Sequence, residues 1–266
     1  MVRLLLRAGA SLSHIDNDLR QYFTGVYHQE IQITKQEYLL GRYRRFGSNN
    51  PELTEVNFWS VMIRSNASAW KAKQKFEDND ESLPVWSFDR FGRTITELPN
   101  GKIIEIGGEH EDSYDPDFCI YNDVVVYQGD GSFKIFGYPP EVFPPTDFHT
   151  ATLVGDYIYI FGNLGYLSHK PGGMASRLNG NPLGLRTVGE TPVYRLNWHT
   201  FKIEQVETSG NKPGWIWDHL AFYHKQNQIV VSGGKIWQKV NEKFGCLDNH
   251  HSFYLDLNTL VWSQLI

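Results

Sequence analysis

Three short segments decide the fold of this chain: KIIEIGG at residues 102–108, YIYIFGN at 157–163 and QIVVSGG at 228–234. In each segment, a mostly apolar run rich in β-branched or aromatic residues ends at a glycine or a glycine pair. A run of this length and composition, bounded by turn-forming residues, predicts a β-strand. Because the same pattern returns three times, we interpret the segments as equivalent strands of an internal repeat.

The repeat extends to both sides of these segments. Its copies cover residues 93–138, 148–207 and 218–265, and each copy contains four short runs with the composition of strands. The turns between the first and second runs, and between the third and fourth, contain Gly, Asn or Asp, which tolerate the positive φ of tight hairpins. Each copy therefore predicts a four-stranded antiparallel sheet.

Several residue types recur in the copies, and we assign them structural roles. Glycine after the second strand lets the chain turn without a side-chain clash, and aromatic rings fill the space between sheets. His149 and His219 share one place in the first strand, close to Asp147 and Asp218. An Asp–His pair suits general-base chemistry, but recurrence favours a structural pin that binds the backbone of a neighbouring sheet. The recurring positions are Gly107, Gly108, Gly233, Gly234, Tyr127, Tyr194, Tyr254, Trp262, His149 and His219.

Four antiparallel strands with a glycine pair after the second, and aromatics in the third and fourth, resemble the kelch motif. The resemblance implies a mainly β protein of three kelch-like blades, a partial or atypical β-propeller with a helical N-terminal region. The second copy departs from the motif, with Phe161-Gly162-Asn163 in place of the diglycine. Closed propellers have about four to eight blades. PVWSF at 84–88 resembles LVWSQ at 260–264, so we interpret it as a strand of a missing or borrowed blade.

Three blades leave exposed sheet edges, which proteins avoid. We consider three solutions: the N-terminal helices cover the gap, two chains combine into one ring, or the sheets pack as a barrel that is not a propeller. We favour the helical cover.

The N-terminal region, residues 1–82, is expected to be helical, and the β-blade domain to occupy residues 83–266. Residues 1–20 resemble a half-repeat of the ankyrin family, in which a Leu-rich helix runs into a Gly-Ala turn; an ordinary Leu-rich helix is the alternative. A half-repeat needs neighbours, so it either caps another element or belongs to a longer chain. We interpret 21–50 as a solvated basic connector and 52–77 as one amphipathic helix.

Composition excludes several classes of protein. Hydrophobic residues make up 41% of the 266 residues and aromatic residues 14%, enough for a sizeable core. The formal net charge of −5 argues against nucleic-acid binding, and no apolar segment is long enough to indicate a membrane span. The two cysteines, Cys119 and Cys246, are too few for a disulfide framework, which fits a cytoplasmic protein. Phosphate-binding, dinucleotide-binding and hydrolase motifs are missing, so we expect no cofactor.

The most polar connection lies in GGEHEDSYDPDFCIYND, residues 107–123. Its acidic residues and His110 allow a metal site, a solvated loop or a surface that contacts a partner or ligand. A calcium loop has a central glycine and a zinc site has more His and Cys ligands. We therefore favour a solvated loop or a contact surface and expect no metal.

This connection, 109–121, and its equivalents 163–190 and 235–250 join the second and third strands of their copies. Such connections share one face of a propeller, and loops on a rigid scaffold are where binding residues concentrate. The candidate binding residues on this face are Glu109, His110, Asp112, Tyr114, Asp115, Tyr166, His169, Trp215 and Trp217.

Repeats without a catalytic motif indicate a non-enzymatic module that uses these connections to bind a protein. The alternative is a small-molecule or carbohydrate-processing enzyme of the kelch-like type, with His110, Asp112, His149 and His219 as its site. A homodimer that completes a propeller is a further alternative, and no motif in the sequence identifies the partner.

Overall fold

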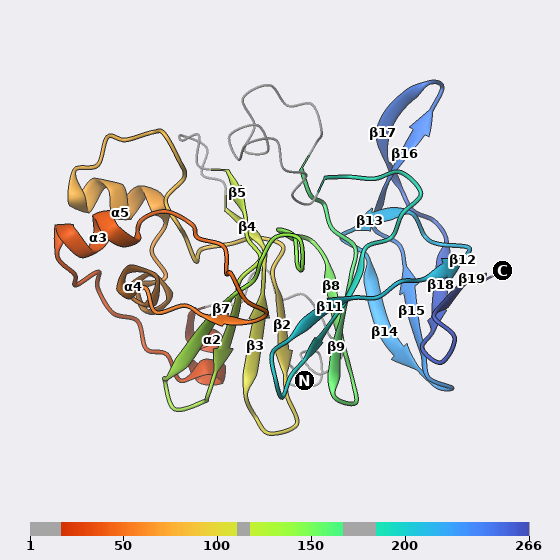
Figure 1. Ribbon diagram of the computed structural model, residues 1–266, viewed down its shortest axis with the longest axis horizontal. Coiled ribbons are helices and arrows are strands. Elements are labelled where there is room, and N and C mark those ends of the chain that lie inside the picture. The colour runs from red at the N-terminus through yellow and green to blue at the C-terminus, as the bar shows by residue number, and fades with distance from the viewer. Residues whose placement is uncertain (1–16, 111–117, 167–184, 266) are drawn as a thin grey trace.

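The computed structural model describes residues 17–110, 118–166 and 185–265 and is mainly β (Figure 1). Each of the three predicted repeats forms four antiparallel strands that neighbour one another in chain order. We call these the first, second and third repeat sheets. The prediction of three successive antiparallel quartets is therefore confirmed, while the described residues form no closed ring of sheets.

The first repeat sheet contains β2 (Thr94–Glu97), β3 (Ile103–Ile106), β6 (Val124–Tyr127) and β7 (Phe133–Gly137). The second contains β8 (Thr150–Val154), β9 (Tyr157–Phe161), β10 (Val193–Asn197) and β11 (Ile203–Gln205). The third contains β14 (Leu220–His224), β15 (Gln228–Ser232), β18 (Ser252–Asp256) and β19 (Val261–Leu265). Two short strands extend the outer edges: β1 (Glu52–Leu53) pairs with β7, and β12 (Ser209–Gly210) pairs in parallel with β19.

The connections around the repeat sheets carry the remaining strands. β4 (Glu109–His110) pairs with β5 (Cys119–Ile120), β16 (Lys235–Val240) forms a hairpin with β17 (Lys243–Asp248), and β13 (Trp215–Trp217) pairs with β16. All five lie at the end of the sheets opposite the β2–β3, β8–β9 and β14–β15 turns (Figure 1). We call this the loop end.

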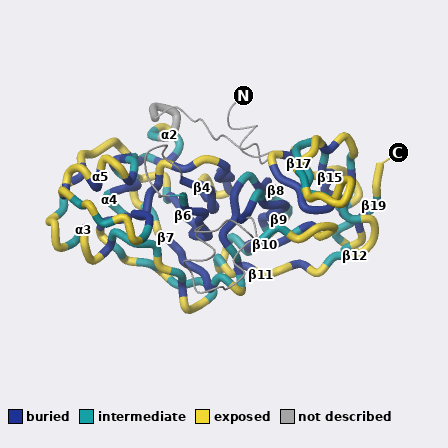
Figure 2. Tube along the Cα trace, turned by 90° about the horizontal axis from the view of Figure 1, so that it is seen from above, coloured by how far each residue is buried: buried dark blue, intermediate teal, exposed yellow. Residues whose placement is uncertain are grey.

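The three repeat sheets pack on one another through two apolar cores. Ile104 of the first sheet and Ile158 of the second belong to one core, and Phe161 of the second and Val231 of the third belong to the other. Side chains alternate between the two faces of a strand, so the second sheet contributes residues to both cores. The buried residues accordingly run through the stacked sheets (Figure 2).

The first strands of successive sheets are joined by buried side chains. His149 Nε2 lies 2.8 Å from Thr94 Oγ1, and His219 Nε2 lies 2.8 Å from Thr150 Oγ1. Each histidine therefore reaches back to the threonine that begins the preceding sheet. The predicted structural pins are present, although their partner is a side chain and not the backbone.

A backbone ladder runs beside these side chains. The Phe148 amide donates to the Gly92 carbonyl at 2.7 Å, and the Asp218 amide donates to the Phe148 carbonyl at 2.8 Å. The three residues precede β2, β8 and β14, and all have positive φ, at 61°, 47° and 53°. The left-handed conformation thus recurs at one position of the repeat, even where the residue is not glycine.

Two of the repeat glycines allow close approach of the next sheet. A Cβ on Gly107 would lie 2.3 Å from the Thr146 carbonyl oxygen, and one on Gly162 would lie 2.4 Å from that of Ile216. Gly233 occupies the same position in the third sheet, with φ +70°, and a Cβ there would meet nothing within 4 Å. Gly107 and Gly162 are therefore required by packing, whereas Gly233 is favoured only by the positive φ of the turn in which it lies.

The tyrosines of the third strands do not occupy equivalent positions. Counted from the rung next to the glycine turn, Tyr194 lies on the second rung, Tyr254 on the third and Tyr127 on the fourth. Tyr194 and Tyr127 point toward the preceding element, while the register places Tyr254 on the other face of its sheet. Each third strand contains a tyrosine, but the three tyrosines do not make an equivalent contact.

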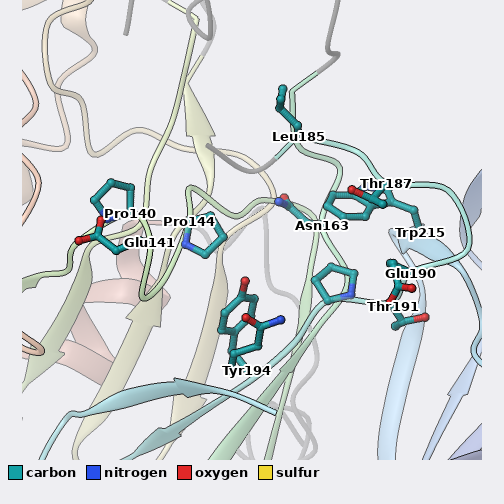
Figure 3. Close-up of a pocket in the computed structure, with 12 residues that line it drawn as sticks. Pro140, Glu141, Pro144, Asn163, Leu185, Thr187, Glu190, Thr191, Tyr194 and Trp215 are labelled. Carbon is teal, nitrogen blue, oxygen red and sulfur yellow. The ribbon is translucent and has the colours of Figure 1, made fainter. Parts of the chain in front are cut away.

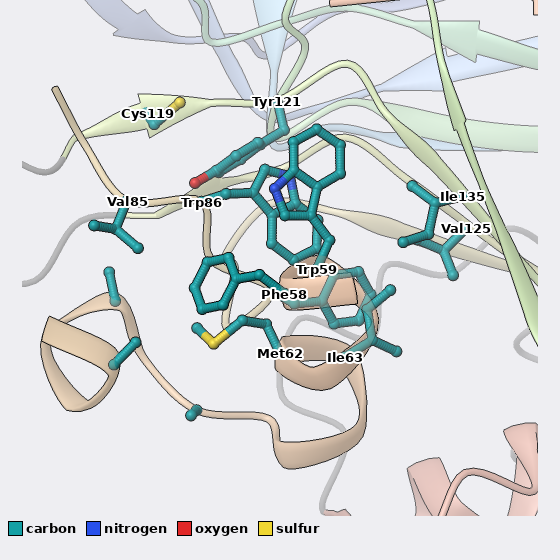
Figure 4. Close-up of a cluster of buried hydrophobic side chains, with 14 of the residues drawn as sticks. Phe58, Trp59, Met62, Ile63, Val85, Trp86, Cys119, Tyr121, Val125 and Ile135 are labelled. Carbon is teal, nitrogen blue, oxygen red and sulfur yellow. The ribbon is translucent and has the colours of Figure 1, made fainter. Parts of the chain in front are cut away.

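The N-terminal helices cover the outer face of the first repeat sheet, as favoured from the sequence. They are α2 (Asn17–Thr24), α3 (Lys35–Gly41), α4 (Asn57–Ser65) and α5 (Ala69–Phe76). Trp59 of α4 stacks on Trp86 with ring centroids 4.7 Å apart, and α4 shares a core with Val125 and Ile135 of the sheet (Figure 4). The helical region and the first sheet are thus packed on a common core.

The expectation of one helix over 52–77 is wrong. Residues 52–53 form β1, and α4 ends at Asn66, which takes the left-handed conformation with φ 47°. Ser68 then begins α5, because its side chain accepts a hydrogen bond from the Lys71 amide. Beyond the break, Trp70 is 44% exposed and lies outside the apolar core.

The interpretation of 21–50 as a solvated connector is also wrong. The segment contains part of α2 and all of α3, and Thr34 and Glu37 form a capping box at the start of α3. Arg42 pairs with Asp78 and, at 2.7 Å, with Asp80. Arg42 forms ion pairs within the protein because the acidic segment 77–84 folds back against it.

The PVWSF segment at 84–88 is not a strand of a fourth sheet. Val85 forms an isolated bridge with Tyr43, and the Trp86 indole donates to Asp123 Oδ2 at 2.9 Å. The segment anchors the helical region to the first sheet, so its likeness to 260–264 does not reflect an equivalent position. Residues 1–16, most of the ankyrin-like segment, lie outside the described residues.

Alanine substitutions at two equivalent glycines test the stacking. Gly162→Ala and Gly233→Ala each place a side chain at positive φ, which costs about 1–2 kcal/mol. Gly162→Ala should lose roughly 1–3 kcal/mol more, because its Cβ overlaps the Ile216 carbonyl of β13, the strand that leads into the third repeat sheet. Urea unfolding measures both losses, and equal losses would contradict the close approach at Gly162.

Candidate binding surface

Part of the predicted binding face is found at the loop end. Glu109 and His110 form β4. His110 is only 2% exposed, and its Nδ1 lies 2.7 Å from the Asp89 carbonyl oxygen, so it belongs to the interior and not to an accessible surface. The other candidates from these loops, Asp112, Tyr114, Asp115 and His169, lie outside the described residues.

Three aromatic candidates are buried. Tyr166, Trp215 and Trp217 are 5%, 6% and 6% exposed. The Tyr166 hydroxyl accepts a hydrogen bond from the Ile120 amide at 2.8 Å, and the Arg186 guanidinium lies 4.9 Å from the Trp217 ring. These rings hold the loop end together, and Trp215 also lines a pocket described below.

The histidines of the enzyme hypothesis are not solvent-facing groups. His149 and His219 are 2% and 4% exposed. Burial lowers the pKa of both from 6.5 to about 3, and the neighbouring His219 lowers that of His149 further. Both imidazoles are therefore neutral near pH 7 and engaged with Thr94 and Thr150. Two of the four residues of the enzyme hypothesis thus have structural contacts in the interior.

The aspartates beside these histidines do not orient them. Asp147 Oδ1 accepts a hydrogen bond from the Gly165 amide at 2.8 Å, and Asp218 is exposed. Burial raises the pKa of Asp147 to about 6, while the Gly165 amide and the Glu109 side chain oppose this rise. His149 Nδ1 and His219 Nδ1 have no hydrogen-bond partner among the described residues. An Asp–His general base is not assembled at either position.

The third repeat sheet has one face that no described residue covers, which sequence reasoning missed. In β2 and β8 the side chains on the corresponding face are Thr94, Thr96, Thr150 and Thr152, all at most 5% exposed under the next sheet. In β14 the same positions hold Leu220 and Phe222, which are 72% and 44% exposed. We call this the open face. The alignment of RTIT, HTAT and HLAF contains a signal for this face, because threonines are replaced by apolar residues only in the last copy.

Register extends the open face across the sheet. Phe222 pairs with Val230, Val230 with Tyr254, and Leu265 with Ser252. Leu265 is 44% exposed and Val261 36%. The face therefore has apolar groups with interspersed serine hydroxyls, of which Ser232 and Ser252 lie 2.7 Å apart. The row that contains Val261 is polar and holds His224, Gln228 and Asp256.

The β16–β17 hairpin projects from the loop end of the third sheet (Figure 1). Phe244 is 58% exposed, and its ring stacks on Trp237 with centroids 6.1 Å apart. Val240 and Leu247 are 39% and 40% exposed. β17 is the outer strand of the β13–β16–β17 sheet, so its backbone edge is unpaired within the described chain.

A pocket of about 380 Å³ lies at the loop end of the second sheet (Figure 3). Its walls come from the connection that follows β7, the segments that flank β9 and β10, and β13. The lining residues are Pro140, Glu141, Pro144, Asn163, Leu185, Thr187, Glu190, Thr191, Pro192, Tyr194, Gln205 and Trp215.

Within the described ranges, no three His, Cys, Asp or Glu residues gather in a way that could hold a metal ion. The same ranges contain no helix with the length and apolar character needed to cross a membrane. No family model matches this chain, and no curated protein sequence matches it.

The buried histidines predict a specific acid sensitivity. A neutral buried imidazole binds its proton only below about pH 3, whereas the unfolded chain binds it below 6.5, so stability falls as the pH drops through this interval. In His219→Gln, which keeps a polar group near Thr150, the loss of unfolding free energy between pH 7 and pH 4 should be about 3 kcal/mol smaller than in the unmodified protein.

Urea unfolding at a series of pH values measures this difference. His199→Gln is the matched control, because His199 is exposed and paired with Asp156. Parallel pH curves for the unmodified protein and His219→Gln would show that His219 is already charged in the folded state.

Proposed function

We propose that the three sheets are kelch-like blades of a partial propeller, and that the chain is a non-enzymatic protein-interaction module. Its binding surface is the open face of the third sheet together with the β16–β17 hairpin. The observation that carries this proposal is the exposure of Leu220 and Phe222, at positions that the next sheet covers in both preceding repeats. Contiguous exposed apolar groups on a folded domain mark interaction sites.

The composition of the surface supports a protein ligand. Burying an exposed Leu or Phe side chain contributes about 1.5–3 kcal/mol, and aromatic anchors such as Phe222 and Phe244 are frequent sources of interface affinity. Ser232, Ser252 and Ser263 lie among the apolar residues by register and offer hydrogen bonds to a partner. An apolar centre with interspersed polar groups is the usual anatomy of such interfaces.

The partner is a different protein and not a second copy that closes a ring. Ring closure would bring the open face of one chain against the outer face of another chain's first sheet. That face already packs against Phe58, Trp59 and Ile63 of α4. The helices thus occupy the place that a ring-closing copy would need, while the open face remains accessible.

The double substitution Leu220→Ser/Phe222→Ser tests the proposal. Partners are identified by cross-linking in cells and mass spectrometry, and the affinity of a purified partner is then measured by calorimetry. The double variant should bind at least about tenfold more weakly, because two apolar anchors are lost. Its urea unfolding curve should change little, since both side chains are exposed in the isolated chain.

Leu40→Ser is the matched control. Leu40 is 65% exposed on α3, at the opposite end of the molecule from the open face. Equal affinity in the double variant and the unmodified protein would rule out the open face, and loss of binding in Leu40→Ser alone would place the interface on the helices.

A further inference from the structure

The pocket at the loop end of the second sheet is lined by a tyrosine hydroxyl that has no hydrogen-bond partner among the described residues. Tyr194 is 9% exposed, and its ring packs edge-on against Phe143 with centroids 5.3 Å apart. Its hydroxyl end points into the pocket (Figure 3) and makes no hydrogen bond with any described residue. Because the hydroxyl is reached from the pocket, a ligand that enters can exchange a hydrogen bond with it in place of water.

The charged residues that line the pocket are both acidic. Glu190 is paired with Lys212 at 2.6 Å, which leaves Glu141 as the lining carboxylate without an ion pair among the described residues. The nearby Arg186 is engaged elsewhere: its Nε donates to the Leu164 carbonyl at 2.7 Å, and its guanidinium lies 4.9 Å from the rings of Trp217 and Trp237. The charge of the pocket therefore favours a cation.

The other polar groups at the pocket restrict the chemical class of ligand further. Asn163 already accepts from the Asp147 amide and donates to the Pro145 carbonyl, and the Thr191 hydroxyl is bonded to Gly214. These groups are satisfied and offer little to a ligand with many hydroxyls. The polar groups that remain at the pocket are the Glu141 carboxylate, which accepts hydrogen bonds, the Tyr194 hydroxyl, which donates or accepts one, and the side chains of Thr187 and Gln205.

We propose that this pocket binds an arginine side chain of the protein partner, an inference that rests on the proposed interaction function. A guanidinium group donates several hydrogen bonds in one plane, pairs with a carboxylate such as Glu141 and stacks on aromatic rings. Tyr194 and Trp215 supply rings, and the volume of about 380 Å³ accommodates one extended side chain with its backbone. The pocket thus adds a charge-specific anchor beside the apolar open face.

The test uses a small probe, so that it does not depend on the partner. Nα-acetyl-arginine methylamide is titrated into the full chain while the indole N–H signal of Trp215 is followed by NMR. We expect a saturable shift, with the neutral citrulline analogue at least about tenfold weaker because the charge is removed. Tyr194→Phe and Glu141→Gln should each weaken the arginine probe about threefold or more.

Glu204→Gln is the matched control, because Glu204 pairs with Arg195 on the same sheet but does not line the pocket. Equal binding of the arginine and citrulline probes, or no saturable shift, would overturn the inference, as would binding of a methyl glycoside in place of the arginine probe. Partner binding that survives such a result, yet is lost in Leu220→Ser/Phe222→Ser, would leave the proposed function standing without this anchor.

Discussion

The molecule depends on the contact between the first strands of successive sheets. A neutral imidazole in one sheet meets a threonine hydroxyl in the preceding one, at His149–Thr94 and at His219–Thr150. Beside each pair, the backbone of one sheet bonds to that of the next through Gly92, Phe148 and Asp218. In an interior that excludes water, these polar groups are satisfied only when the sheets sit at one offset. The apolar cores supply most of the stabilisation, and the hydrogen bonds fix the geometry in which those cores form.

The array ends differently on its two sides. On the first sheet, α4 fills the outer face with Phe58, Trp59 and Ile63, so the apolar surface of that sheet is buried. On the third sheet, Leu220 replaces the threonine that would receive another histidine, and Phe222 replaces the next threonine of the same face. A fourth sheet of the same kind would find no hydroxyl there, so the face suits an apolar partner better than a continuation of the ladder. The same replacement that ends the repeat creates the surface on which the functional proposal rests.

In the proposed function, the third repeat sheet and the loop end supply two kinds of recognition. The open face and the β16–β17 hairpin offer apolar area, which contributes affinity with little directional preference. The Tyr194 pocket offers a hydroxyl and the Glu141 carboxylate, and the proposed arginine ligand would bond to both. Because both are carried by sheets that pack on common cores, their spacing is set by the stack. Such an arrangement allows specificity to change through loop residues while the sheets stay the same.

The sequence by itself determined the three four-stranded sheets, the hairpin turns and a structural role for His149 and His219, because strand periodicity, turn residues and repetition are local signals. The threonine partners of the two histidines were shown only by the structure. The sequence also favoured a helical cover for the first sheet. It did not reveal the break at Asn66, the pairing of Arg42 with Asp78, or the loss of equivalence among Tyr127, Tyr194 and Tyr254. Those features depend on which segments meet in space and on the register of the strands. The open face and the unpartnered Tyr194 hydroxyl were likewise decided by tertiary structure, since exposure and hydrogen-bond satisfaction are properties of the packed chain and not of any residue alone.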